Sequence, residues 1–382
     1  MFDTLARSRI ATAGLFMMLF VSSIKPNVFA ESFVFNPDRQ LVWGVAFSPD
    51  DRYVVATGED GAVLMWERES CGLQSVMVPL AVTDQVYGAE SPRIVTGIAW
   101  SPTKPEFATA MRDGSVRLWQ IGRDGNRETE EKAVYDSNLS TNPLHLPGLR
   151  SVAFSPDGSL LAAAGHGPLI YVWKTVDATA PLLELDGQTN VINTVAFGRD
   201  NSTLISAGID GTIRFWDLER KTVERTIKTS KRTIRAVVSS DRHYLAVTSY
   251  NVDQGVVTDR SETLIYDVNT GEEVRRFTIR YDRYEFIWSH AFSPDNRFLA
   301  VGTIGGSRIR LFDLEQGQEA WVLAINNDSN DGIKDLVFSH SGQYVLAGVW
   351  GDGPHLLDAK TGLQLKRYGG ALCEAKQRGL TP

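Results

Sequence analysis

A short apolar segment that ends at a turn recurs seven times along the chain. The first copy reads Val-Ala-Phe-Ser-Pro-Asp at residues 45–50. A buried apolar stretch follows each copy, and a third strand-like segment then ends at a large side chain. The interval between the ends of the first and third segments is 19 residues in five copies, 20 in the sixth and 28 in the fifth. These intervals join Phe47 to Trp66, Trp100 to Trp119, Phe154 to Trp173, Phe197 to Trp216, Val238 to Tyr266, Phe292 to Phe312 and Phe338 to Leu357.

Each repeat has room for a fourth strand. A further β-like run, such as residues 75–78 or 223–228, lies between the third strand of one repeat and the first strand of the next. Helical periodicity of useful length is absent from the sequence. The pattern predicts an all-β fold, a single seven-bladed β-propeller of four-stranded antiparallel blades. The blades are expected to start near residues 42, 95, 149, 192, 233, 287 and 333.

Two segments carry a family resemblance. Residues 208–217 read Gly-Ile-Asp-Gly-Thr-Ile-Arg-Phe-Trp-Asp and residues 112–119 read Arg-Asp-Gly-Ser-Val-Arg-Leu-Trp. Both resemble the WD-repeat signature, and the resemblance extends over residues 42–368. It implies the family's propeller fold and a role as a protein-interaction platform. It also implies fold-supporting hydrogen-bond networks, expected here among Thr109, Asp113 and Trp119 and among Ser206, Asp210 and Trp216.

The sequence departs from the family pattern in two ways. Only repeats four to seven keep the terminal Asp, and the usual Gly-His pair before the first strand is eroded. Two segments could supply the outer strand of the seventh blade, residues 363–368 or residues 33–35. We favour the C-terminal strand, with the N-terminal segment packed nearby, because an unpaired sheet edge must be covered.

The first 30 residues have the pattern of a secretory signal peptide. Arg7 and Arg9 precede an apolar run at residues 10–24, and small residues precede an expected cleavage after Ala30. We therefore expect a signal peptide at 1–30 and the propeller at 31–382, exported to the periplasm or the extracellular space, with no membrane span after cleavage. The alternative is an uncleaved N-terminal anchor in the membrane.

The net charge argues against one class of partner, and the two cysteines leave their redox state open. The formal net charge is −7, and removing Asp3, Arg7, Arg9 and Lys25 with the leader makes it −9. This acidic balance argues against nucleic acid as a partner. Cys71 and Cys373 could pair in an exported compartment or remain free thiols, and their spacing has no metal-binding signature.

Candidate binding residues lie at one position of the repeat, four residues before the end of each first strand. Loops that enter the first strands converge at one end of a propeller channel, so we expect these side chains to lie together there. The seven positions hold Trp43, Thr96, Arg150, Asn193, Ile234, Trp288 and Lys334, and Arg235 follows Ile234. We take Trp43, Arg150, Asn193, Arg235, Trp288 and Lys334 as candidate binding residues. Alternatively, the tryptophans pack between blades and channel water solvates the cations.

The fifth repeat carries an insertion between its second and third strands, within residues 249–263. We interpret it as a solvated recognition loop. Its oxygen-bearing side chains, including Asp253 and Asp259, leave a calcium site as an alternative. A second insertion, at residues 122–146, is charged in its first half and has the composition of a solvated surface.

Signals for catalysis are weak. The channel positions offer one acid, Asp335, and the six histidines stand at unlike strand positions. Nucleophile-elbow and phosphate-loop motifs are absent. We therefore expect no catalytic residues, no cofactor and no metal, and a monomeric propeller that binds a protein or peptide. The alternative is a hydrolase or lactonase-like enzyme that uses the central channel.

Overall fold

The computed structural model describes residues 41–375 except residue 60 and residues 78–93, 123–128, 138–147, 230–231, 254–255, 281–284, 326–331 and 370–371. The chain divides into two units, residues 1–35 and 36–382, and the described residues all lie in the second. The expected leader and the alternative closing segment at 33–35 lie outside the described residues.

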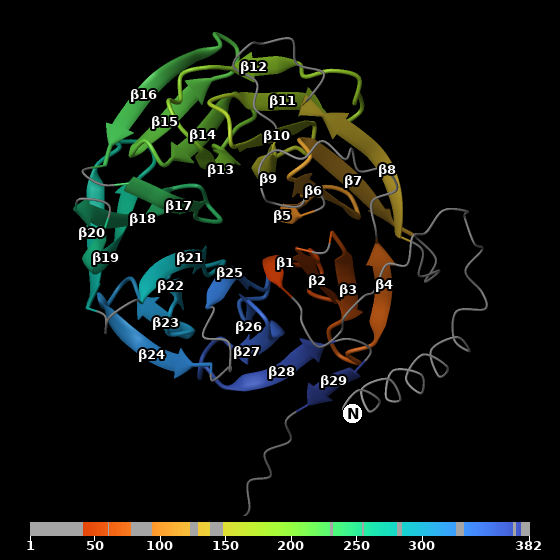
Figure 1. Ribbon diagram of the computed structural model, residues 1–382, viewed down its shortest axis with the longest axis vertical. Coiled ribbons are helices and arrows are strands. Elements are labelled where there is room, and N and C mark those ends of the chain that lie inside the picture. The colour runs from red at the N-terminus through yellow and green to blue at the C-terminus, as the bar shows by residue number, and fades with distance from the viewer. Residues whose placement is uncertain are drawn as a thin grey trace, which may run out of the picture. The chain divides into compact units, whose positions relative to one another are not determined.

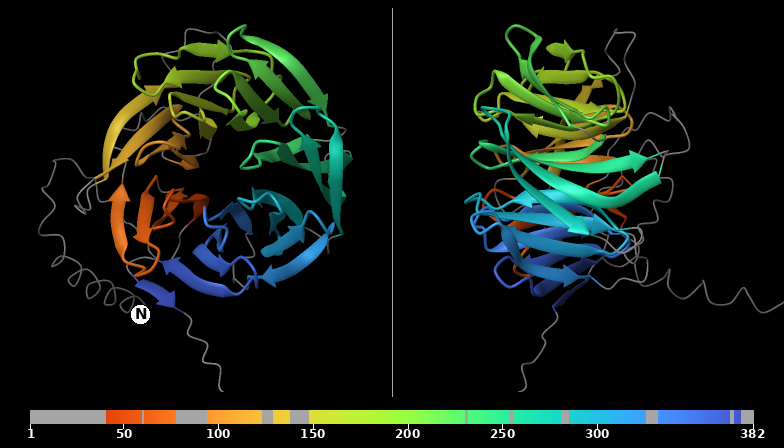
Figure 2. Two further views of the ribbon diagram at one scale, coloured as in Figure 1. Left: turned by 180° about the vertical axis from the view of Figure 1, so that it is seen from behind. Right: turned by 90° about the vertical axis from the view of Figure 1, so that its left-hand side faces the viewer.

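Seven antiparallel sheets form the blades of a ring, which confirms the predicted seven-bladed β-propeller (Figures 1 and 2). We number the blades along the chain. In every blade the strands pair in chain order, from the first strand at the channel to the fourth near the periphery. The described part of the chain contains no α-helix, and so no helix there that could cross a membrane.

The first four blades contain sixteen strands. They are β1 Val42–Phe47, β2 Tyr53–Gly58, β3 Val63–Glu67 and β4 Leu73–Met77 in blade 1; β5 Val95–Trp100, β6 Glu106–Met111, β7 Ser115–Ile121 and β8 Thr129–Asp136 in blade 2; β9 Leu149–Phe154, β10 Leu160–Gly165, β11 Ile170–Lys174 and β12 Leu183–Leu185 in blade 3; and β13 Ile192–Phe197, β14 Thr203–Gly208, β15 Thr212–Asp217 and β16 Thr222–Lys228 in blade 4.

The last three blades include a five-stranded sheet in blade 7. Their strands are β17 Arg232–Val238, β18 Tyr244–Asp253, β19 Val256–Asp267 and β20 Glu273–Arg280 in blade 5; β21 Phe286–Phe292, β22 Phe298–Ile304, β23 Arg308–Asp313 and β24 Gln318–Ala324 in blade 6; and β25 Ile333–Phe338, β26 Tyr344–Val349, β27 Gly353–Asp358, β28 Gln364–Gly369 and β29 Leu372–Ala375 in blade 7. The favoured C-terminal segment therefore supplies the fourth strand of blade 7, and β29 pairs outside it.

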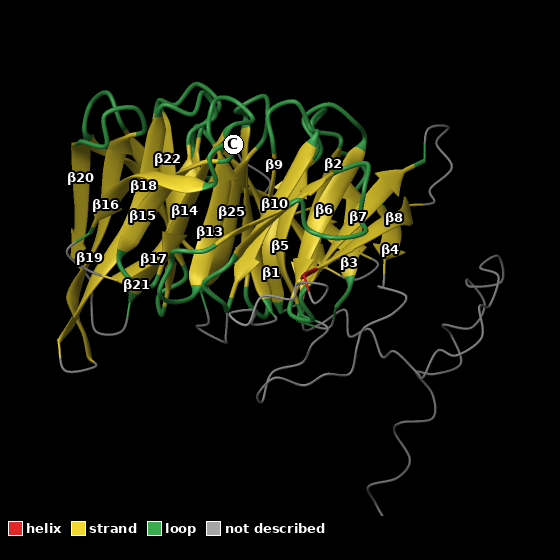
Figure 3. Cartoon of the chain, turned by 90° about the horizontal axis from the view of Figure 1, so that it is seen from above, coloured by secondary structure: helices red, strands yellow, loops and turns green. Residues whose placement is uncertain are grey.

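The recurrent Ser-Pro-Asp motif builds the turn between the first and second strands. In blade 1 the Ser48 hydroxyl donates to Asp50 Oδ1 at 2.5 Å and accepts the Tyr53 backbone N–H at 2.8 Å. Ser155 makes the equivalent contacts with Asp157 and Leu160 in blade 3. Local side-chain bonds of this kind fix a tight turn. As Figure 3 shows, such turns lie at the rims of the ring and the strands run between the rims.

The hydrophobic core lies between neighbouring blades. Each buried cluster draws residues from two adjacent sheets; one, for example, joins Trp173 and Leu161 of blade 3 to Ala108 and Leu118 of blade 2. A tryptophan near the end of the third strand is fully buried in several blades. Burial of such large apolar side chains is the main stabilising contribution in folding.

The insertion in blade 5 is a correction to the sequence interpretation. Strands β18 and β19 stay paired as far as Asp253 opposite Val256, so the extra residues lengthen a β-hairpin and do not form a loop. Residues 254–255 at its tip lie outside the described residues.

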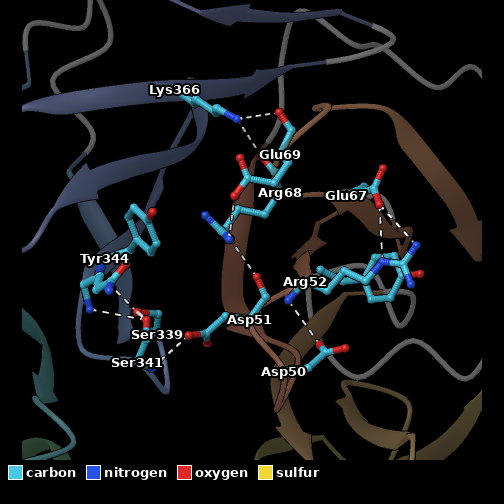
Figure 4. Close-up of polar contacts among 12 residues, drawn as sticks. Asp50, Asp51, Arg52, Glu67, Arg68, Glu69, Ser339, Ser341, Tyr344 and Lys366 are labelled. Atoms are coloured by element: carbon cyan, nitrogen blue, oxygen red, sulfur yellow. Dashed lines mark hydrogen bonds and ion pairs between the residues drawn. The ribbon is translucent and has the colours of Figure 1, made fainter.

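Side chains join the first blade to the seventh (Figure 4). Asp51, in a left-handed conformation with φ of 56°, accepts the backbone N–H of His340 at 2.6 Å and of Ser341 at 2.8 Å. Lys366 Nζ donates to the carbonyls of Arg68 and Glu69, each at 2.7 Å. The fourth strand of blade 7, β28, comes from the C-terminal part of the chain. Blade 7 is therefore not closed by a strand from the N-terminal part, and these side-chain bonds connect blades 1 and 7 instead.

A disulfide-bonded cysteine lies close to the same seam. Cys71 lies in the turn between β3 and β4, two residues after Glu69, and its sulfur is in a disulfide bond. The chain has one other cysteine, Cys373, in strand β29, and its side chain lies outside the described residues. The sequence left open whether Cys71 is paired or a free thiol, and the structure shows that it is in a disulfide bond.

Candidate functional site

A β-bulge occurs at the same place in the first strand of all seven blades. In β1 the pairing passes from Val42 opposite Gly58 to Gly44 opposite Thr57, which leaves Trp43 unpaired. The other six first strands skip the equivalent residue. The bulged residues are Trp43, Thr96, Arg150, Asn193, Ile234, Trp288 and Lys334, the seven positions singled out from the sequence. A bulge re-aims the side chain of the residue that it leaves unpaired.

A second set of side chains is held beside the bulges by one repeated backbone bond. In five blades the residue that follows the second strand donates its N–H to the carbonyl of the residue just before the first strand. These bonds run from Glu59 to Leu41, Arg112 to Ile94, His166 to Gly148, Ile209 to Val191 and Trp350 to Gly332, at 2.8–3.1 Å. In these five blades the first and second strands thus bring two residues to the same end of the channel.

Several of these side chains line a cavity of about 60 Å³ that is open to solvent at the channel mouth. Its lining consists of Trp43, Thr96, Arg112, Arg150, Asn193, Arg235 and Trp288. Five of the six candidate binding residues therefore line one cavity, and Lys334 contacts two of its tryptophans. The side chain of Ile234 lies outside the described residues.

Lys334 lies in a cage of three tryptophans. Its ammonium is 5.5 Å from the ring centre of Trp43, 5.1 Å from that of Trp288 and 4.7 Å from that of Trp350. Trp43 and Trp350 also meet edge to face at 5.1 Å. Cation–π attraction to the three rings stabilises a lysine at this position.

Arg235 is neutralised within the channel. Its Nη2 is 2.9 Å from Asp335 Oδ1 and its Nη1 donates to the Lys334 carbonyl at 2.7 Å. Asp335 also accepts the Val45 backbone N–H at 3.0 Å. Burial raises the pKa of Asp335 above its ordinary value, although Arg235 and the backbone bonds act in the opposite direction. The single acid among the channel positions therefore links blades 1, 5 and 7.

Two further arginines, Arg150 and Arg112, line the cavity. Arg150 donates from Nη1 to Asn193 Oδ1 at 3.1 Å, and burial lowers its pKa. The pKa of Arg112 is lowered by burial and by Arg150, while Glu59 raises it. His166 lies beside both, and burial followed by the charges of Arg150 and Arg112 lowers its pKa to about 4. His166 is therefore neutral near pH 7.

The predicted fold-supporting contacts are present in part. Trp119 Nε1 donates to Thr109 Oγ1 and Trp216 Nε1 donates to Ser206 Oγ, each at 2.9 Å. The aspartates are bonded elsewhere: Asp113 accepts from Ser115, and Asp210 accepts from Thr212, Thr189 and Gln188. Gln188 stands at the position of the family's usual histidine and also contacts Arg214. The hydrogen bonds of the two tryptophans therefore do not include the aspartates, which the prediction had placed in the same networks.

Sequence reasoning missed Arg112, His166 and Trp350. All three stand twelve positions after the last residue of the first strand, at the end of the second strand. Aligning the seven repeats, which identified the bulged positions, would also have identified this second position, because its distance from the end of the first strand is constant. In the described ranges, no three His, Cys, Asp or Glu side chains gather in a way that could hold a metal ion.

Comparison with known proteins identifies the family. The family model described as "WD domain, G-beta repeat" matches residues 31–67, 82–120, 137–174, 179–217 and 275–313, just over half of the chain. The chain belongs to the WD-repeat family. Within this WD-repeat propeller, the first three strands of blades 5 and 7 fall outside the matched segments, in keeping with the extended hairpin in blade 5.

The WD-repeat relatives are distant. The chain is 23% identical over 216 residues to Protein LST8 homolog of Drosophila melanogaster, covering 55% of this chain and 62% of the relative. It is 25% identical over 267 residues to Guanine nucleotide-binding protein subunit beta of Oryza sativa subsp. japonica, covering 66% and 65%. It is 26% identical over 215 residues to WD repeat-containing protein 89 homolog of Dictyostelium discoideum, covering 56% of each. The matched part thus spans less than two thirds of each relative.

Proposed function

We propose that this WD-repeat propeller is a non-catalytic protein-interaction platform that acts outside the cytoplasm and binds its partner at the channel mouth. One observation carries the proposal: five of the seven bulged residues, Trp43 and Trp288 among them, line a single cavity together with Arg112 and Arg235. Tryptophan and arginine are the side chains most enriched where proteins bind one another tightly.

Family membership supports an interaction role. The rice relative is named as a subunit, which places that protein in an assembly. Binding, unlike catalysis, requires no reactive group at the mouth, and Asp335 is engaged with Arg235 and Val45. The wall residues instead offer area, cation–π surface and hydrogen-bond donors.

Two features support a location outside the cytoplasm. The order of arginines, apolar run and small residues before position 31 is that of an export signal. The disulfide at Cys71 is the kind of bond that persists in oxidising compartments and is rare in the cytosol. Fractionation of cells that express the full chain tests this: mature protein that begins at residue 31 outside the cytoplasm is expected, and full-length protein in the cytosol would contradict it.

Binding at the mouth is tested by crosslinking in the native compartment followed by capture. Wild type is compared with the double variant Trp43→Ala and Trp288→Ala, and with Arg220→Ala as the control. Arg220 lies in the turn between β15 and β16, at the opposite end of the strands from the bulges, and its side chain is exposed. A partner recovered by wild type and Arg220→Ala but lost with the double variant is expected. Equal recovery by all three would rule out the mouth.

A further inference from the structure

The side chain at one position of the fourth strand crosses to the next blade at three boundaries of the ring. In each case it donates to one or both of the first two backbone carbonyls after the third strand of that next blade. The donors and their acceptors are Arg225 with Val268 and Asn269, Trp321 with Ala359, and Lys366 with Arg68 and Glu69. The three donors share one register, opposite the residue that precedes Trp216, Phe312 or Leu357 in the third strand. These bonds tie the rim of one blade to the rim of the next.

Arg275 stands at this position in blade 5. It pairs with Ile265, in the same register as the three donors above. Its guanidinium lies over the turn between β23 and β24, where a Cβ added to Gly317 would be 2.7 Å from Nη1. The matching carbonyls of that turn belong to Leu314 and Glu315, and within the described residues Arg275 donates to neither of them. The boundary between blades 5 and 6 therefore lacks the bond that closes the three others.

A cavity of about 440 Å³ lies at this boundary, on the rim opposite the channel mouth. It is open to solvent, and Arg275, Leu314 and Glu315 all line it. Its apolar surface includes Ile265, Leu314 and Val274, and the side chain of Val274 is 50% exposed. We call this cavity the side groove. Cavities of this size hold small ligands or several side chains, so the side groove has room for a peptide segment.

The wall that blade 6 contributes to the side groove is acidic. Arg297 Nη2 is 2.9 Å from Asp313 Oδ2, and Arg297 Nε is 3.6 Å from Glu315 Oε2. The hydrogen bond with Asp313 raises the pKa of Arg297, and the charges of Glu315 and Asp295 act in the same direction. Three carboxylates thus surround one guanidinium group on this wall. Their excess negative charge favours a cationic group of a ligand.

The wall from blade 5 offers a hydrogen-bond donor. Its carboxylate, Asp241, bonds to Ser239 in its own turn, and the Asp241 backbone carbonyl accepts from Arg199 Nε at 3.2 Å. Arg275 lines the groove beside it. Because its counterparts at three other boundaries donate to backbone carbonyls, a peptide carbonyl is the acceptor that matches this position.

We infer that the side groove is a second docking site, which binds an extended segment of a partner protein that has an apolar side chain next to a lysine or arginine. The apolar side chain packs on Val274, Ile265 and Leu314. The basic side chain lies against the acidic wall of blade 6, and Arg275 donates to a backbone carbonyl of the segment. The inference goes beyond the proposed function, because the side groove and the channel mouth lie at opposite rims and bind independently.

Three capped peptides of glycine and serine test the inference by NMR titration of the isotope-labelled mature protein. Their central pairs are leucine–arginine, leucine–glutamate and glycine–arginine. The leucine–arginine peptide is expected to bind about threefold or more tightly than either of the others, because each of those lacks one of its two contacts. The amide signals of Val274 and Gly317 should shift on binding, and that of Thr96 at the channel mouth should not.

A lysine in the side groove should repel the basic peptide. Val274→Lys is expected to weaken binding of the leucine–arginine peptide about fivefold or more, and the exposure of this position lets the variant fold. Val76→Lys is the matched control, since Val76 lies in β4 of blade 1 and is 45% exposed. It should bind the peptide as wild type does.

Melting curves test whether the boundary is open. Arg225→Ala removes bonds between blades 4 and 5 and should lower the Tm by about 2–4 °C, whereas Arg275→Ala should change it by less than about 1 °C. Arg275→Ala should also weaken binding of the leucine–arginine peptide about threefold or more. An equal loss of Tm in the two variants would show that Arg275 closes its boundary as Arg225 does, and would overturn the inference.

The binding results separate the side groove from the channel mouth. Equal affinity for the three peptides, tighter binding of the leucine–glutamate peptide, or no shift at millimolar peptide overturns the side groove. Binding that is lost with the double variant Trp43→Ala and Trp288→Ala but kept by Val274→Lys places the peptide at the mouth, so the side groove fails and the proposed function stands. Binding that is lost with Val274→Lys and kept by the tryptophan double variant supports the side groove, even if crosslinking finds no partner at the mouth.

Discussion

The Asp51 carboxylate accepts the backbone N–H of Ser341 at 2.8 Å, across the seam between the first and seventh blades (Figure 4). It accepts the His340 N–H as well, at 2.6 Å. Burial alone would raise the pKa of Asp51, but the hydrogen bonds from Ser341 and His340 outweigh it and hold the pKa below 3.8. One side chain therefore satisfies two backbone donors of the opposite blade.

Asp51→Asn is expected to lower the free energy of unfolding by about 1–3 kcal/mol, because an amide can accept only through one oxygen and loses the charge assistance. Asparagine tolerates the left-handed conformation at this position, so backbone strain stays small. Urea unfolding measures the change. Asp50→Asn is the control, since Asp50 bonds only within blade 1, and a loss as large as that of Asp51→Asn would contradict the role of the seam.

The advantage of wild type over Asp51→Asn should also depend on pH. The folded-state pKa of Asp51 lies below its ordinary value, so the ionised carboxylate stabilises the fold above pH 3.8 and this contribution is lost as the pH falls below it.

Ala163→Ser is expected to stabilise the protein by about 1 kcal/mol, because it supplies a missing acceptor. Thr109 and Ser206 accept the indole N–H of the tryptophan ten residues later, while Trp173 has Ala163 at that position. The strand register is the same in all three blades, and Trp173 Nε1 is buried without a partner among the described residues. A higher melting temperature is expected. Ala162→Ser, which points to the other face of β10, should lower it, and the opposite order would refute the assignment.

Reduction of the disulfide is expected to lower the melting temperature, by the equivalent of about 2–4 kcal/mol. Cys71 is bonded, and Cys373 is the one other cysteine of the chain, so we expect the bond to join blade 1 to strand β29. Peptide mapping without reductant should show the linked pair in a monomeric protein. Cys71→Ser and Cys373→Ser should each melt at the temperature of the reduced wild type, and unequal effects would indicate a different pairing.

Acid is expected to weaken the fold through His290. Its ring lies buried between Thr248 and Thr263, and burial followed by the charge of Arg235 lowers its pKa to about 3. The unfolded chain binds a proton near pH 6.5 but the folded chain does not, so stability falls as the pH drops from about 6.5 toward 3. His290→Gln should flatten part of this dependence in urea unfolding between pH 7 and pH 4. Parallel profiles for the two proteins would contradict the assignment.

The sequence contained most of the architecture because a propeller is built from one repeated unit. The 19-residue interval, found in five repeats, separates the ends of a first and a third strand that both pair with the second strand. The residue four positions before the end of each first strand is the bulged one. The Ser-Pro-Asp motifs also act within a few residues, since Ser48 and Asp50 hydrogen-bond to each other within one turn. Local chemistry of this kind can be read from spacing.

Long-range contacts could not be read in the same way. Asp335 stood out as a possible channel acid, but its partner Arg235 lies 100 positions earlier in another blade. The tryptophans around Lys334 come from blades 1, 6 and 7, and only the closed ring brings them together. The extra residues of blade 5 were polar enough to suggest a loop, and backbone pairing across β18 and β19 overrode that composition.

The seven bulges have an evolutionary consequence. A bulged residue stands outside the register of its sheet, so its side chain can be exchanged without shifting the strands that bury the core. Such positions can accept new side chains one blade at a time, and ligand preference can diverge between descendants of a single ancestor while the scaffold is inherited unchanged. In this chain the seven places hold six different residue types, tryptophan twice and arginine, lysine, asparagine, threonine and isoleucine once each.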